Sequence, residues 1–305
     1  MGEFGLGAAG ATVTVGTFDG VHLAHHAVLQ ETARRAAAAG RACVVVTFDP
    51  HPVEVVRPER APLRLTTEVE RRAAMAACGV EHVLVLRFDA VLAALPPEQF
   101  VSDILMARCG MRELVIGHDH GFGRGRSGDA NTLRHIGEVE GFEVAVVPQV
   151  EVNGVRVSSS AIRQSLVAGD LDGAASMLGR RYDVMAPVGE GAGRGRKLGI
   201  PTINLADVSL RKQLPPDGVY AVRVEWRGGQ AGGMMNQGPR PTFGDDERTL
   251  EAHLFGVDAD LYGEWVRLEW VARLREVRQF ATPAELTRQL ERDHAAALAA
   301  LADPA

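Results

Sequence analysis

The sequence predicts an α/β protein in which a parallel sheet is followed by a small antiparallel β-barrel and a C-terminal helix. Between about residues 12 and 147, short β-branched runs alternate with helical stretches, and strands joined through helices form parallel sheets. After Tyr182 this alternation stops, and strands with a two-residue period follow one another between turn residues, as in small barrels. We therefore expect two domains, 1–182 and 183–305, which a length of 305 residues permits.

Composition narrows the class of protein. Hydrophobic residues make up 46% and charged residues 24%, as in soluble globular proteins, and the net charge of -6 argues against binding a nucleic-acid backbone. The N-terminus lacks the basic and apolar regions of a signal peptide, and no run reaches the ~20 apolar residues of a membrane span. Cys43, Cys78 and Cys109 are odd in number and widely spaced, which suits reduced thiols. We expect a soluble, cytoplasmic protein with neither nucleic-acid nor membrane partners.

The first half contains a regular series of strands and helices. After a strand at 12–15, buried strands bounded by breakers are expected at 41–48, 82–88, 112–117 and 142–148. Gly40 should close the first helix, Thr67 and Glu70 should form a capping box for the second, and Gly110 should end the helical segment that Pro97 begins. Ligands of parallel sheets bind at the carboxyl ends of the strands, so the loops there are the candidate site.

The loop after the first strand reads GTFDGVHLAH, residues 16–25, and leads into an alanine-rich helix. A strand that stops at glycine and reopens as a helix presents unpaired N–H groups and a positive dipole end, which suits a phosphate. His22 and His25 stand three residues apart, so both imidazoles face the same anion from the first helical turn. A cation is disfavoured at a helix N-terminus, so a metal site fits this stretch less well.

Three later loops also lie at carboxyl ends of strands. They are FDPHP at 48–52, GHDHGFGRGRSGD at 117–129, and VSSSAIR at 157–163, which follows a type I′ hairpin at Asn153 and Gly154. Serines in the last loop can cap the following helical stretch, 159–178, and Arg163 can reach a phosphate. Each loop taken alone also fits an ordinary turn with solvated charges.

Two other interpretations of the 117–129 loop are weaker. A dinucleotide fingerprint should open a helix directly after the first strand, and GFGRGR does not. A short arginine patch in an acidic chain is weak evidence for RNA binding, and His118 with His120 lack a third metal ligand at a sensible spacing.

The motifs GxFDGxH, TFxPHP, GxDxxFG and SSxxIR, in this order, resemble the adenylyltransferase half of prokaryotic bifunctional riboflavin kinase/FAD synthetases over about residues 12–182. The resemblance implies a Rossmann-like nucleotidyltransferase sheet, transition-state stabilisation by His22 and His25, and a catalytic role for Asp119. Positions that it assigns to substrate binding are Gly16, Phe18, Asp19 and Gly20 in the first loop, Ser158, Ser159 and Arg163 around the triphosphate, and Phe48 and Phe122 beside the flavin. The chain departs from the pattern at Ala24, His120, Gly121 and Ser160.

The second half contains a glycine-rich stretch among its strands. Strands are expected at 219–226, 248–255 and 264–274, and a long helix at 283–301. GEGAGRGRKLGIPTINL, residues 189–205, lets backbone amides approach an anion and adds basic charge, although it lacks the GKS/T ending of a Walker A loop. Glu251 should leave its strand on the face opposite Leu250, Ala252 and Leu254, where a solvent-exposed glutamate is the plain interpretation.

LGxPTxN together with ExHLxxxxxDLYG resembles the riboflavin kinase domain over about residues 183–293, and NQGPRPTF at 236–243 extends the match. The resemblance implies that Thr202 ligates magnesium and that Glu251 is the general base for the riboflavin 5′-hydroxyl. It assigns nucleotide binding to Gly191, Gly195, Arg196, Lys197 and Asn204. Ile203 departs from the alanine usual in the family.

Both resemblances together imply a bifunctional enzyme that makes FMN from riboflavin and ATP, and FAD from FMN and a second ATP. ATP would be the co-substrate, Mg²⁺ the cofactor, and riboflavin, FMN and FAD the substrates and products. Two alternatives remain: a riboflavin kinase whose adenylyltransferase half is inactive or has changed acceptor, and a non-catalytic flavin-binding protein.

Overall fold

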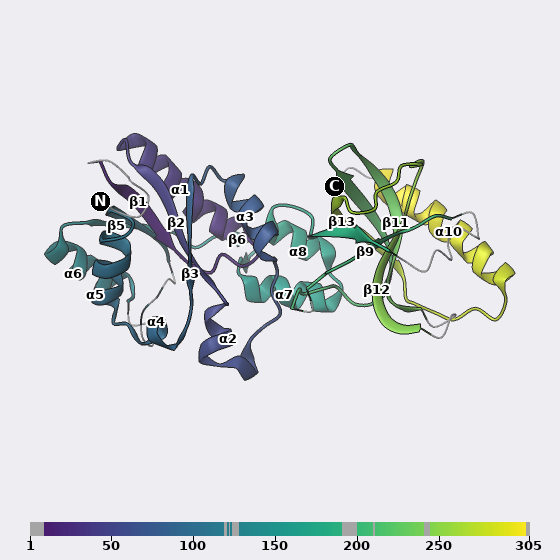
Figure 1. Ribbon diagram of the computed structural model, residues 1–305, viewed down its shortest axis with the longest axis horizontal. Coiled ribbons are helices and arrows are strands. Elements are labelled where there is room, and N and C mark those ends of the chain that lie inside the picture. Colours follow the sequence, from purple (N-terminus) through teal and green to yellow (C-terminus); the bar gives the residue numbers. More distant parts are fainter. Residues whose placement is uncertain are drawn as a thin grey trace. The chain divides into compact units, whose positions relative to one another are not determined.

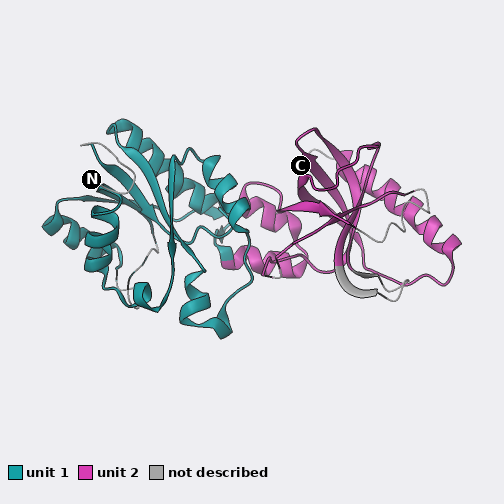
Figure 2. Ribbon diagram, viewed as in Figure 1, with its two compact units in different colours: residues 1–159 teal, residues 160–305 magenta. Residues whose placement is uncertain are grey.

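The computed structural model describes residues 9–118, 121, 123, 128–190, 200–209, 211–240 and 245–302, without the side chains of 239, 240 and 245–248. The chain divides into two compact units, residues 1–159 and 160–305 (Figure 2). Each unit is described by itself below.

A parallel sheet forms the centre of the first unit, as predicted (Figure 1). In the described residues its strand order is β3-β2-β1-β4-β5, and every neighbouring pair runs parallel. The strands are β1 (Ala11–Val15), β2 (Ala42–Asp49), β3 (His82–Arg87), β4 (Met111–Gly117) and β5 (Glu143–Val147). The chain order reverses between β1 and β4, and open α/β sheets bind ligands at the carboxyl ends of strands at such a point.

Helices cover both faces of this sheet. On one face of the sheet, Val45 packs with Leu29 and Met75, and Val115 packs with Val28. On the other face, Val44, Val46 and Ile116 belong to a larger cluster. Elements between and after the strands are α1 (Leu23–Ala38), α2 (Pro52–Val56), η1 (Pro58–Arg60), α3 (Glu68–Ala76), α4 (Ala90–Ala94), α5 (Pro97–Phe100), the π-helix η2 (Val101–Met106) and α6 (Ala130–Glu140). Because alternate residues of each strand are buried on opposite faces, the strands read as continuous apolar runs.

The predicted helix ends are confirmed. Gly40, just beyond α1, has φ +61°, and Gly110, beyond η2, has φ +62°. Thr67 and Glu70 form the capping box of α3, since each side chain accepts a hydrogen bond from the other's backbone N–H.

The hairpin β6 (Glu151–Val152) and β7 (Val155–Arg156) turns at Asn153 and Gly154, both at positive φ, as predicted. The helical stretch that follows is two helices rather than one: α7 (Ser159–Ala168) and α8 (Leu171–Leu178). Gly169, at φ +77°, ends α7, and the Asp170 carboxylate caps α8 by accepting from the Gly173 N–H. An AGD sequence thus stops one helix and starts the next.

The second unit contains a closed barrel with strand order β10-β11-β12-β9-β8-β13 in the described residues (Figure 1). Its strands are β8 (Asp183–Gly189), β9 (Ile203–Leu205), β10 (Gly218–Trp226), β11 (Gly229–Arg240), β12 (Asp245–Leu254) and β13 (Trp265–Arg275). Sequence reasoning predicted β10, β12 and β13 but not the other three. Four glycines weaken the strand signal of β11, β9 is short, and Pro187 interrupts β8. Local strand propensity is therefore low in these three segments, and pairing with neighbouring strands in the barrel stabilises them.

Large side chains fill the barrel, and the C-terminal helix lies outside it. Tyr220 and Trp270 are fully buried inside, and the buried Gln237 amide accepts from the Trp270 indole at 3.0 Å. The predicted helix is α10 (Pro283–Ala302), which packs Ala297 against Met234 and neighbouring apolar residues (Figure 1).

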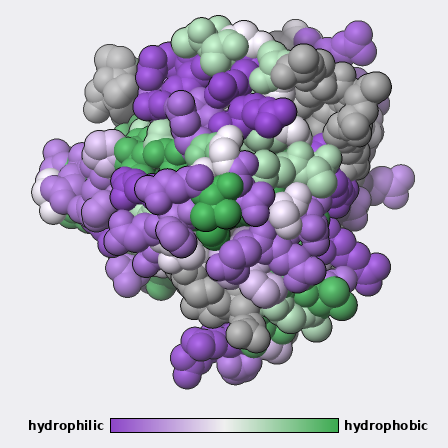
Figure 3. All heavy atoms as spheres, turned by 90° about the vertical axis from the view of Figure 1, so that its left-hand side faces the viewer, coloured by the Kyte–Doolittle hydropathy of each residue, from purple (hydrophilic) through white to green (hydrophobic). Residues whose placement is uncertain are grey.

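Hydrophilic side chains cover most of the face in Figure 3, where hydrophobic residues form small separate groups. Within the described ranges, no helix combines the length and the apolar character needed to cross a membrane.

Candidate active sites

The loop between β1 and α1 has an unusual backbone. Phe18 and Val21 adopt positive φ without being glycine, at 49° and 38°, and Gly20 lies between them at 87°. A Cβ on Gly20 would lie 2.7 Å from Cδ1 of Leu65, which is fully buried. Strained conformations of this kind persist only where the surrounding structure imposes them, and they gather at functional sites.

Asp19 holds this loop in place. Its carboxylate accepts hydrogen bonds from the N–H groups of Leu65, at 2.9 Å, and Thr66, at 3.0 Å. The Gly20 N–H in turn donates to the Thr66 hydroxyl at 3.0 Å. The carboxylate therefore ties the loop to the segment before α3. The predicted nucleotide contact of Asp19 stays a prediction.

His22 and His25 lie at the start of α1, as the spacing predicted. Nδ1 of His22 accepts from the His25 N–H at 3.3 Å and so caps the helix, which leaves the proton of a neutral His22 on Nε2. The two rings are stacked, with centroids 3.6 Å apart, and the Phe18 ring meets His25 edge-on at 5.2 Å. The structure thus brings the two imidazoles together, with the buried Phe18 ring packed against His25.

Burial lowers the pKa of both imidazoles. Desolvation and, second, the neighbouring His25 lower the pKa of His22 to about 2, and desolvation with His26 lowers the pKa of His25 to about 3. Both rings are neutral at pH 7 and can donate an N–H without carrying charge. Nδ1 of His25 is buried and has no hydrogen-bond partner within the described part of the chain, as expected of a group that meets a ligand.

A second helix begins beside the same loop. The Ser159 hydroxyl, at the first residue of α7, donates to the backbone carbonyl of Asp19 at 2.9 Å. Two helix N-termini, those of α1 and α7, therefore lie next to the loop, and the positive end of a helix dipole favours an anion there. Ser158 immediately precedes α7, and Arg163 follows Ser159 by about one helical turn.

Phe48 lies at the carboxyl end of β2 and is buried. The ring packs against Phe88 at 5.4 Å and Phe100 at 6.3 Å, so it belongs to the core of the sheet. A flavin contact by Phe48 stays a prediction.

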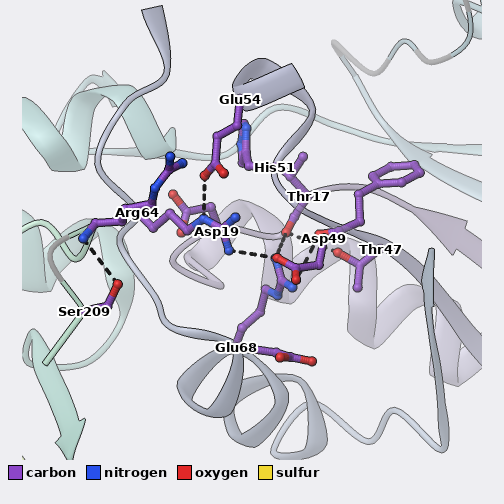
Figure 4. Close-up of polar contacts among 12 residues, drawn as sticks. Thr17, Asp19, Thr47, Asp49, His51, Glu54, Arg64, Glu68 and Ser209 are labelled. Atoms are coloured by element: carbon purple, nitrogen blue, oxygen red, sulfur yellow. Dashed lines mark hydrogen bonds and ion pairs between the residues drawn. The ribbon is translucent and has the colours of Figure 1, made fainter. Parts of the chain in front are cut away.

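Two arginines beside these loops were missed by sequence reasoning. Arg64 donates to Asp49 at 3.1 Å and to Glu54 at 2.8 Å, which links β2 to α2 (Figure 4). Arg71, buried on α3, reaches the carbonyl of Thr17 at 3.3 Å and that of Phe48 at 3.5 Å. Desolvation lowers the pKa of this guanidinium, and Arg64 adds to the effect. The one sequence signal for Arg71 was a basic residue on the buried face of an otherwise amphipathic helix.

Several predicted site residues lie outside the described residues: Asp119, Phe122, Gly191, Gly195, Arg196 and Lys197. Among the residues that are described, no cluster of three or more His, Cys, Asp or Glu side chains is arranged to hold a metal ion.

The barrel brings the other predicted residues together. The Thr202 hydroxyl donates to Oε1 of Glu251 at 2.6 Å. Glu251 pairs with Asn204 on β9 and with Asn236 on β11, so these three side chains share one face of adjacent strands. This is the face opposite the buried Leu250, Ala252 and Leu254, as predicted. Asn236 was not assigned a role from the sequence, because only strand register places it beside Glu251.

The donor set on this face consists of oxygen atoms: a hydroxyl, a carboxylate and two amide carbonyls. Hard cations such as Mg²⁺ prefer such ligands and usually bind protein through few side chains while keeping phosphate oxygens. The set therefore fits Mg²⁺ bound together with a nucleotide.

Comparisons with known proteins agree for both units. The family model described as FAD synthetase matches residues 7–161, and that described as riboflavin kinase matches residues 178–301. A bifunctional riboflavin kinase/FMN adenylyltransferase of Escherichia coli K12 is 38% identical, with 93% of this chain and 90% of that protein covered. A protein of the same description from Pseudomonas fluorescens is 39% identical, with 97% and 94% covered.

A solved structure shares the fold over both units. It is described as a macrolide-efflux protein from Streptococcus pneumoniae, is 30% identical, and superimposes with a TM-score of 0.84 over 96% of this chain and 95% of that one.

Proposed function

The chain belongs to the family of bifunctional riboflavin kinase/FMN adenylyltransferases, and we propose that it phosphorylates riboflavin to FMN and then adenylylates FMN to FAD. In this proposal residues 1–182 carry the adenylyltransferase and residues 183–305 the kinase. The enzyme acts in the cytoplasm on ATP, riboflavin and FMN, without nucleic-acid or membrane partners.

The observation that carries the adenylyltransferase is the stacked histidine pair at the start of α1. The FMN phosphate attacks the α-phosphorus of ATP, a new P–O bond forms, and pyrophosphate leaves. N–H groups of His22 and His25 donate to the α-phosphate oxygens, and the buried Nδ1 of His25 gains a partner in the complex. Both rings are neutral at rest. In the complex, their N–H groups replace water molecules as hydrogen-bond donors to the triphosphate oxygens.

Other residues of the first site bind and orient the substrates. We assign the triphosphate to Ser158, Ser159, Arg163 and the helix N-termini, with Gly16, Phe18, Asp19 and Gly20 shaping the loop beneath it. Asp119 completes the catalytic set, and Phe48 and Phe122 flank the flavin.

In the barrel we assign the general base to Glu251. Its carboxylate holds the Thr202 hydroxyl and retains acceptor capacity for the proton of the riboflavin 5′-hydroxyl, which attacks the γ-phosphorus as ADP leaves. Thr202 and Asn204 would hold Mg²⁺, and Gly191, Gly195, Arg196 and Lys197 would hold the ATP phosphates. Magnesium, when bound, neutralises charge on the transferred phosphoryl group.

Product chromatography tests the proposal. Purified protein is given riboflavin, ATP and MgCl₂, and FMN is expected to appear first and then to be converted to FAD. FMN that accumulates without FAD would favour the kinase with an inactive adenylyltransferase, whereas flavin binding without ATP consumption would refute both activities.

A further inference from the structure

His253 lies two residues after Glu251 on β12 and therefore on the same face of the strand. Its Nδ1 lies 2.7 Å from the backbone carbonyl oxygen of Pro201. A carbonyl can only accept a hydrogen bond, so Nδ1 must carry the proton. His253 and Glu251 thus hold two consecutive residues of the facing segment, Pro201 and Thr202.

The segment that enters β9 is held residue by residue. Ile200 packs into the apolar cluster between the barrel and α10. The carbonyl of Pro201 is held by His253, and the hydroxyl of Thr202 by Glu251. Ile203 and Asn204 then pair with Ala252 and Glu251 in the barrel. Among the described residues, the bond from His253 holds the backbone of this segment immediately before Thr202.

The imidazole of His253 is itself oriented by its neighbours. The Phe255 ring meets it edge-on at 5.7 Å, and Phe255 packs against His294 of α10 at 4.4 Å. Because aromatic contacts limit rotation of the ring, the Nδ1–H direction toward Pro201 is fixed before any substrate binds.

We propose that His253 is a positioning residue for phosphoryl transfer. Its Nδ1–H fixes the backbone at Pro201, which sets the place of the Thr202 hydroxyl relative to Glu251 and to the ATP phosphates. The inference rests on the kinase function proposed for Thr202 and Glu251. The Thr202 hydroxyl bond fixes only the end of a rotatable side chain, whereas the His253 bond fixes the main chain that carries it. Small misplacements of groups that orient substrates are costly in rate.

Three substitutions test this role. His253→Asn keeps an N–H donor at the same number of bonds from Cα as Nδ1, His253→Gln moves the donor one bond further, and His253→Ala removes it. The Ala and Gln variants are expected to lose about tenfold in kcat/KM for MgATP, and the Asn variant is expected to recover most of it. The KM for riboflavin should stay unchanged at saturating MgATP.

A second readout needs neither ATP nor magnesium. Amide hydrogen exchange of a peptide covering residues 200–206 should accelerate in the Ala and Gln variants of the substrate-free protein, and less so in the Asn variant. Trp226, Trp265 and Trp270 are all the tryptophans of the chain and all lie in the barrel, so unchanged emission verifies its folding. His135→Ala, on the exposed side of α6 in the first unit, is the control for removal of a histidine.

The outcomes separate this inference from the function on which it rests. If Glu251→Gln abolishes FMN formation while His253→Ala keeps full kcat/KM for MgATP, the positioning role is refuted and the kinase assignment stands. An Asn variant as impaired as the Ala variant also refutes it, because the hydrogen bond would then not be the cause. If Glu251→Gln leaves FMN formation intact, the assigned kinase site itself is refuted.

Discussion

The imidazole rings of His22 and His25 are stacked, with centroids 3.6 Å apart and planes inclined by 14°. Burial makes it costly to charge either ring, with His25 adding to the effect on His22 and His26 to that on His25, so the pKa falls to about 2 for His22 and about 3 for His25. A neutral pair of donors at a helix N-terminus can receive a phosphate without first losing a bound counterion.

The histidine pair should make the first unit sensitive to acid. The unfolded chain takes up protons on histidine near pH 6.5, whereas the folded chain keeps His22 neutral to about pH 2. Stability from this group is therefore present above pH 6.5 and is lost as the pH falls, by about 1 kcal/mol per pH unit. His22→Asn keeps a helix-capping acceptor and removes the titration, so the pH dependence of its unfolding free energy should be shallower between pH 6 and 4.

Urea unfolding followed by circular dichroism measures this dependence, and tryptophan emission reports the barrel separately. His135→Asn, at an exposed histidine of α6, is the matched control for removal of a histidine outside the pair. Equal slopes for the parent protein and His22→Asn would show that the pair does not titrate as described.

The two activities should be separable by single substitutions. His25→Ala removes a ring to which we assign stabilisation of the adenylyl transfer, so it should lower FAD formation from FMN by at least about a hundredfold, while FMN formation from riboflavin persists. Glu251→Ala should have the reverse effect. Chromatography of both reactions measures this, and a substitution that disabled both steps equally would contradict two separate sites.

Gly20 should tolerate alanine less well than another glycine of similar backbone conformation. At Gly141, φ is +80° and a Cβ would meet nothing within 4 Å, so Gly141→Ala should cost only about 1 kcal/mol of backbone strain. Gly20→Ala adds a contact at 2.7 Å with Leu65 and should cost about 2–4 kcal/mol. Urea unfolding compares the two variants within the same unit, and equal losses would mean that the Leu65 contact is relieved without cost.

Thr202 should act through its hydroxyl. Thr202→Val keeps the shape of the side chain but leaves Oε1 of Glu251 without this donor, whereas Thr202→Ser keeps the donor. We expect the Val variant to lose at least about tenfold in kcat/KM for MgATP and the Ser variant to lose much less. FAD formation from supplied FMN serves as the internal control, since it should not change in either variant.

Local pattern in the sequence was sufficient for much of the fold. The parallel sheet follows from apolar runs of four to eight residues between helical stretches, and the ends of α1 and α3 follow from Gly40 and from the capping box of Thr67 and Glu70. Helix caps and turn residues act within a few positions along the chain, so the sequence contains all the information that they need. The break between α7 and α8 was of the same kind, at Gly169 and Asp170, and was overlooked.

Spacing along the sequence likewise determined that His22 and His25 share a helix face and that Glu251 lies opposite Leu250 and Ala252. Only the tertiary structure decided which distant residues meet these groups. Ser159 reaches the carbonyl of Asp19 across 140 positions, and Thr202 reaches Glu251 across 49. Such contacts depend on strand order and register. Both are set by the arrangement of the whole chain that buries the most apolar surface. A hydrogen bond between residues so far apart leaves no periodic signal in the sequence, and glycine-rich β11 became a strand because barrel closure gave it partners on both sides.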